Sequence, residues 1–186
     1  MRDLNGFLKK ILLIFNILLL TLLPYSKILA QTPFTVYSDY HHVWDGEVIN
    51  STIYITLTTQ DSSTLITYYT ISLAQKDITP KVFSITRNLT LEPTVHKREE
   101  YTDLVIDLDN TLISQDKPVT LKINYTTPAD SNNINLLSSI PDTQSRDFTF
   151  TYPTSKGEVS WSSTPISEYK QIGENSKVVT QSPKTT

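Results

Sequence analysis

Ile53-Tyr54-Ile55-Thr56-Leu57-Thr58 alternates aliphatic residues with tyrosine or threonine at every position. Successive side chains of a β-strand point to opposite faces of its sheet. This alternation therefore places the aliphatic side chains on one face and the hydroxyl groups on the other. β-Branched and aromatic side chains also pack well on a pleated, half-buried surface. The segment 47–59 thus predicts a strand with one face in an apolar core and the other toward water.

The same period-two pattern recurs along the chain, with turn-forming residues between the runs. It is found in segments 65–73, 104–109, 119–126 and 147–152. Turn residues occupy positions 45–46, 60–63, 114–118 and 128–133. Strands of this kind predict an all-β fold, an antiparallel Ig-like β-sandwich with about seven or eight strands in residues 31–141. We expect no amphipathic helix after residue 30.

Residues 1–30 are predicted to be a secretory signal peptide. A basic start that includes Lys10 precedes the largely apolar run 11–23, and Ala30 offers a small residue for cleavage. Lys27 ends the run before the length of about 20 apolar residues that a membrane-spanning helix needs. The alternative is an uncleaved anchor, because Ile28 is bulky for its position before the cut. Both interpretations place residues 31–186 outside the cytoplasm.

A closing boundary is expected at Ile140-Pro141-Asp142. Beyond it, residues 142–186 contain short β-type stretches and then a polar tail that begins near Gly173. We predict three parts: a signal peptide at 1–30, a β-sandwich domain at 31–141, and a partial second β segment with its tail at 142–186.

Composition excludes several classes of protein. With 19 acidic and 16 basic residues, the chain has no excess of positive charge for pairing with nucleic-acid phosphates. The absence of cysteine excludes a disulfide framework, a zinc-thiolate site and a cysteine nucleophile. Only four glycines are available for phosphate-binding loops. An exported chain without cysteine favours a bacterial surface protein.

One stretch carries a sharper motif. Leu104-Val105-Ile106-Asp107-Leu108-Asp109-Asn110-Thr111-Leu112 is similar to the first motif of the haloacid-dehalogenase-like phosphatases, an apolar strand followed by Asp-x-Asp-x-Thr. The resemblance implies that Asp107 would attack phosphorus and Asp109 would act as general acid and base. That motif belongs at the end of a parallel strand in an α/β fold, with helices following. We therefore interpret both aspartates as water-facing residues of a strand that turns at Asn110-Thr111, and a phosphatase stays an alternative.

The histidines do not form an evident catalytic or metal site. His41 and His42 are near several carboxylates, but neighbouring strand residues point to opposite faces and cannot easily share one ion. His96 begins a charge run, 96–100, that we expect to coat a solvated edge. No Gly-x-Ser-x-Gly elbow is present for a hydrolase. We expect no catalytic residue, no metal and no cofactor.

Outward aromatic residues could stack on sugar rings. The candidates are Tyr54, Tyr68 and Tyr101. Cross-strand packing explains strand tyrosines equally well. Trp44 and Trp161 are expected to pack at sheet margins.

The order of segments after residue 30 resembles the N-terminal region of secreted bacterial transglutaminase-like proteins. The similar segments are 34–37, 43–46, 48–58, 69–73, 117–125, 140–141, 148–153 and 157–161. In those proteins a β-sandwich precedes a catalytic domain with a Cys-His-Asp triad. This chain has no cysteine, so no catalytic residue is carried over.

The resemblance implies a non-catalytic exported module, a scaffold or interaction domain of a transglutaminase-like surface protein. The chain would then be a fragment of such a protein or an independent relative. The alternative is a stand-alone adhesion or carbohydrate-binding sandwich. Expected partners are proteins or cell-wall glycans, with no nucleic acid. Contact with a membrane is expected only through an uncleaved leader.

Overall fold

The computed structural model describes residues 34–59, 63–129, 136, 138–139, 143–157 and 166–181. The predicted signal peptide lies outside these residues, as does Trp161. The described segments contain no α-helix and hence no helix long and apolar enough to cross a membrane. Nearly all of them are strands, which form two sheets.

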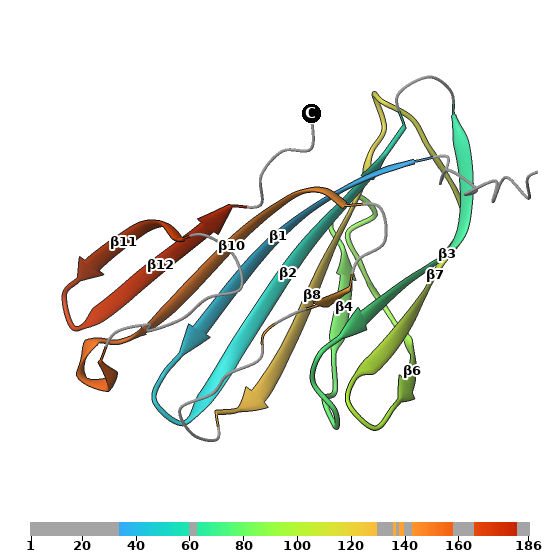
Figure 1. Cartoon of the computed structure of the whole chain (residues 1–186). Coiled ribbons are helices and arrows are strands. Elements are labelled where there is room, and N and C mark those ends of the chain that lie inside the picture. Colours follow the sequence, from blue (N-terminus) through green and yellow to red (C-terminus); the bar gives the residue numbers. More distant parts are fainter. Residues whose placement is uncertain are drawn as a thin grey trace, which may run out of the picture. The chain divides into compact units, whose positions relative to one another are not determined.

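The larger sheet has eight strands in the order β11-β12-β10-β1-β2-β8-β4-β5 (Figure 1). These are β1 (Thr35–Trp44), β2 (Val48–Thr58), β4 (Lys81–Ser84), β5 (Leu89–Leu91), β8 (Val119–Pro128), β10 (Thr143–Pro153), β11 (Ile166–Ile172) and β12 (Asn175–Gln181). A short 3-10 helix, η1 (Thr154–Lys156), follows β10. Neighbouring strands are antiparallel except β1 and β10, which run parallel.

The smaller sheet has four antiparallel strands in the order β6-β7-β3-β9. These are β3 (Thr64–Leu73), β6 (Thr94–Lys97), β7 (Thr102–Ile113) and β9 (Ser138–Ser139). In Figure 1 the labelled strands of this sheet lie on the β8–β4 side of the larger one.

One apolar core joins the two sheets. Ile53 of β2 and Ile123 of β8 face each other in the larger sheet, and Ile71 of β3 and Leu104 of β7 do so in the smaller one. All four side chains are buried in a single cluster. Because both sheets contribute their inward faces to that cluster, the fold is an all-β sandwich, as the alternation predicted.

The alternation within β2 and β8 is confirmed residue by residue. Burial alternates along β2 from Ile49 to Leu57 and along β8 from Val119 to Tyr125. The intervening threonines, Tyr54, Lys122 and Asn124 lie on the outer face. Two outer-face pairs are bonded across these strands: the Thr52 hydroxyl donates to Asn124 Oδ1 at 2.9 Å, and the Thr56 and Thr120 hydroxyls are 3.2 Å apart.

The strands after residue 142 belong to the same sheet as the first strand. β10 pairs with β1 from Val36 to Val43, and β12 and β11 extend the sheet beyond β10. The expected division at residue 141 is therefore not marked by a change of sheet.

Truncation of Ile53 tests the placement of the core. Ile53→Ala should lower the free energy of unfolding by about 2–5 kcal/mol, because the side chain is fully buried and its loss leaves a cavity. Urea unfolding measures this change. Val43→Ala on β1 is the control, since Val43 is 46% exposed, and it should cost no more than about 0.5 kcal/mol. Equal effects of the two substitutions would contradict the assignment.

Candidate interaction surface

The phosphatase-like motif lies inside strand β7, where it forms a β-bulge. Ile66 of β3 faces Thr111, and Tyr68 of β3 faces Asp107. One residue of β3 between these pairs therefore opposes three residues of β7. Asp109 and Asn110 have φ values of 51° and 50°, in the left-handed region that non-glycine residues seldom adopt.

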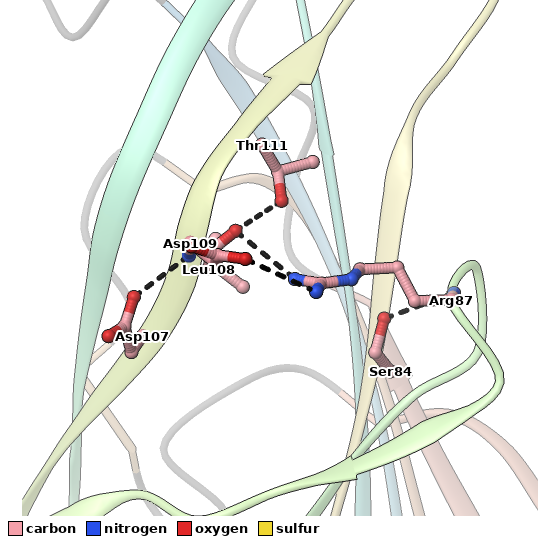
Figure 2. A network of polar contacts seen from close by, with 6 residues as sticks. All are labelled: Ser84, Arg87, Asp107, Leu108, Asp109 and Thr111. Atoms are coloured by element: carbon pink, nitrogen blue, oxygen red, sulfur yellow. Dashed lines mark hydrogen bonds and ion pairs between the residues drawn. The ribbon is translucent and has the colours of Figure 1, made fainter.

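Side-chain contacts hold the bulge in place (Figure 2). The Asp107 carboxylate accepts the backbone N–H of Asp109 at 2.8 Å. The Thr111 hydroxyl donates to the backbone carbonyl of Leu108, and Thr67 donates to Asn110 Oδ1 at 2.6 Å. Asn and Asp tolerate the left-handed region best among residues with side chains, partly because their short polar groups bond locally.

Arg87 reaches the bulge from the turn after β4. Its guanidinium donates to the Leu108 carbonyl at 3.3 Å and lies 3.7 Å from the Asp109 carboxylate. The Ser84 hydroxyl accepts the backbone N–H of Arg87 at 3.2 Å, which fixes the base of this turn (Figure 2). Arg87 thus ties the larger sheet to the bulge of the smaller one.

Asp107 and Asp109 are both exposed, as expected for water-facing residues. The prediction that the strand turns at Asn110-Thr111 is wrong, because β7 bulges there and continues to Ile113. Within the residues that the structure describes, no α-helix follows the motif, and the next strand is β8, which pairs antiparallel with β2 and β4. The Asp107 carboxylate is engaged in a backbone turn.

The bulge also changes which residues of β3 and β7 face the core. Leu104, Ile106 and Leu108 point inward before it, whereas Ile113 points inward after it. A period-two strand without a bulge would turn Leu112 inward. Instead Leu112 is 57% exposed, and its cross-strand partner Leu65 is 59% exposed.

These leucines and Tyr68, which is 60% exposed, form what we call the apolar patch. It lies on the outer face of the smaller sheet on both sides of the bulge. The sequence did not predict that these leucines are exposed. The period-two alternation of each strand, taken alone, predicts that both leucines face the core. The signal in the sequence was Asp109-Asn110, two residues that favour φ above zero.

The two neighbouring histidines lie on opposite faces, as expected. His41 Nε2 is 2.8 Å from the Asp39 carboxylate, and its ring packs edge-on against Tyr54 on the outer face. His42 is fully buried, with Nδ1 2.8 Å from the Ser51 hydroxyl. Burial, and secondarily the nearby His41, lowers the pKa of His42 to about 4.

The other predicted candidates occupy structural positions. The Asp45 carboxylate accepts the N–H groups of Val48 and Glu47, each at 2.9 Å, and these bonds lower its pKa. His96 is exposed on the edge strand β6. In the part of the chain that the structure describes, no three His, Asp or Glu side chains gather to hold a metal ion.

Among the aromatic candidates, Tyr54 is half-buried and Tyr101 is 42% exposed. Trp44 is half-buried at the end of β1, with Lys156 Nζ 5.2 Å from its ring centroid. This contact fits the expected packing role at a sheet margin.

No protein-family model matches the sequence, and no curated protein matches it. The fold does match solved structures. A mutant M1 zinc metallopeptidase from Deinococcus radiodurans bound to a Tyr-Ser-Ala substrate has a TM-score of 0.54 at 10% identity, over 82% of this chain and 40% of that chain. An aminopeptidase A from Legionella pneumophila in complex with aspartic acid has a TM-score of 0.50 at 15% identity, over 81% and 20%.

At these identities the likeness shows a shared fold alone. The chain spans two fifths or less of the length of these two peptidases. None of these matches is a transglutaminase-like protein, so that family resemblance stays a prediction.

Substitution at Asp109 separates a structural bulge from a catalytic aspartate. Asp109→Val should destabilise the fold by about 1–2 kcal/mol, because a β-branched side chain is strained at φ 51°. Asp109→Gly should stay within about 0.5 kcal/mol of the native chain, since glycine adopts this φ freely and the exposed ion pair contributes little. Thermal unfolding measures both. Phosphate-ester hydrolysis that Asp107→Asn abolishes would instead support the phosphatase.

Acid should destabilise the fold through His42. Its pKa is about 6.5 when unfolded and about 4 when folded, so the unfolded state binds more protons between these values. Stability is therefore retained above pH 6.5 and falls by roughly 3 kcal/mol as the pH drops toward 4. His42→Gln should flatten this part of the profile, whereas His41→Gln should keep most of it, because burial is the larger cause of the lowered pKa of His42. An unchanged slope in His42→Gln would contradict the assignment.

Proposed function

We propose that this chain is a non-catalytic, exported β-sandwich module that acts as a scaffold or interaction domain of a transglutaminase-like surface protein. The observation that carries the proposal is the apolar patch of Leu65, Leu112 and Tyr68. Each of these side chains is more than half exposed. Contiguous exposed apolar surface is typical of sites that contact other proteins.

The position of the patch supports a docking role. It lies on paired strands rather than on a loop, and the polar contacts of the bulge fix these strands. A rigid apolar surface loses little conformational entropy on binding. Leucines held in this way would present a preformed contact to a neighbouring domain.

The similarity to solved structures supports the proposal that this chain is a module of a longer assembly. In the two matched peptidases the part similar to this chain covers 40% and 20% of the whole chain. The resemblance to transglutaminase-like proteins gives the same arrangement, with a β-sandwich ahead of a catalytic domain. The partner we propose is therefore a catalytic domain of the transglutaminase-like type.

Titration with a purified transglutaminase-like catalytic domain tests the proposal. The full chain should bind, and Leu65→Ser combined with Leu112→Ser should weaken binding by about tenfold or more, because the apolar contact is lost. Calorimetry measures both affinities. Tyr37→Ser combined with Val43→Ser is the matched control, since these residues are exposed on the other sheet. A native chain that does not bind, or a loss shared by the control, would contradict the proposal.

A second candidate function is carbohydrate binding by the outer face of the larger sheet. Tyr54 lies between His41, 5.8 Å from its ring centroid, and Lys122, with Nζ 5.8 Å from it. The Asn124 amide and Asp39 carboxylate supply polar groups nearby on the same face. Such a ring among hydrogen-bonding groups suits a sugar.

Binding to a glycan array and to isolated cell walls tests this candidate. Tyr54→Ala should abolish retention, whereas Tyr68→Ala on the smaller sheet should leave it unchanged. Retention that survives Tyr54→Ala would exclude this face as the binding site.

A further inference from the structure

Among the strands that the structure describes, β11 is the outermost of the larger sheet at one end. It pairs with β12 on one side, and all seven of its residues are exposed. Its backbone N–H and C=O groups on the other side can pair with a further strand.

The hairpin geometry indicates which residues face that edge. A two-residue turn, Gly173-Glu174, joins β11 to β12, and Ile172 faces Asn175 across it. In such hairpins the pair beside the turn is hydrogen-bonded, and bonded and non-bonded pairs then alternate. Tyr169 is three residues before Ile172, so its N–H and C=O point away from β12 toward the free edge.

The sequence of β11 is complementary to itself around Tyr169. When two copies of the strand run antiparallel with Tyr169 facing its own counterpart, Glu168 of each copy faces Lys170 of the partner subunit. In this register Tyr169 forms the hydrogen-bonded pair, and the Glu–Lys pairs are the closer, non-hydrogen-bonded kind. Opposite charges directly across two strands stabilise their pairing.

The charges within one copy favour the same arrangement. Lys170 faces Lys177 of β12, and like charges opposite each other destabilise a sheet. Glu168 faces the uncharged Val179. Neither Glu168 nor Lys170 takes part in an ion pair among the described residues. Glu168 of the partner subunit would place a carboxylate beside the two lysines.

We propose that β11 binds β11 of a second copy of this chain, giving a two-fold symmetric dimer with one continuous sheet. The irregularity between Ile166 and Glu168 ends the regular pairing, so the contact is short and centred on Tyr169. A contact of this size gives a weak dimer whose population depends on protein concentration.

Charge reversal tests the dimer with sedimentation velocity on the full chain over a range of concentrations. The native chain should show a monomer–dimer equilibrium. Lys170→Glu and Glu168→Lys should each raise the dimer dissociation constant by about tenfold or more, because like charges then face each other. Circular dichroism and thermal unfolding confirm that each variant is folded.

Mixing the two variants distinguishes this contact from any other. Lys170→Glu chains carry two glutamates at the edge and Glu168→Lys chains carry two lysines, so an equimolar mixture should recover the dimer. The double variant with both substitutions should also dimerise, because its charges are exchanged but still complementary. A native chain that stays monomeric throughout, or variants whose association is unchanged, would overturn the proposal. So would association with an added foreign strand peptide but not with itself.

Discussion

Aliphatic side chains from two sheets pack into one core, and the strands that line it must keep their apolar residues in phase with that core. In β2 and β8 the phase is unbroken, and the buried positions from Ile49 to Leu57 and from Val119 to Tyr125 are evenly spaced. A shift of one residue would carry a whole face of isoleucine and leucine into water, so this constraint fixes the register of the central strands.

The bulge in β7 is the place where the phase changes. The left-handed conformations of Asp109 and Asn110 move the inward positions from Leu108 to Ile113 and turn Leu112 outward. Backbone strain of this kind persists only where its surroundings hold it. Here Asp107, Thr67 and Arg87 supply the contacts. The motif that resembles a phosphoryl-transfer site thus forms a bulge in β7, and Leu112 and its cross-strand partner Leu65 are exposed beside it.

The alternation of apolar and polar residues predicted which face of each regular strand is buried, and it predicted the sandwich. This was possible because period-two burial follows directly from the residue types along a strand. It also placed His41 and His42 on opposite faces. The parallel pairing of β1 with β10 was not predictable in this way, since pairing between segments about one hundred residues apart has no local signal. The contact of Arg87 with the bulge was not predictable for a similar reason. Its hydrogen-bond acceptor is the backbone carbonyl of Leu108, and no residue type in the sequence indicates such a contact.

The backbone conformation of Asp109 and Asn110 tests the central claim most directly. Three-bond couplings between the amide and Cα protons, together with Cα chemical shifts, report φ at both residues by NMR. We expect positive φ at both residues, with Thr111 paired to Ile66 in an extended strand. Negative φ at both, followed by helical shifts from Thr111 onward, would contradict it. That result would restore the strand-then-helix setting of a phosphatase site.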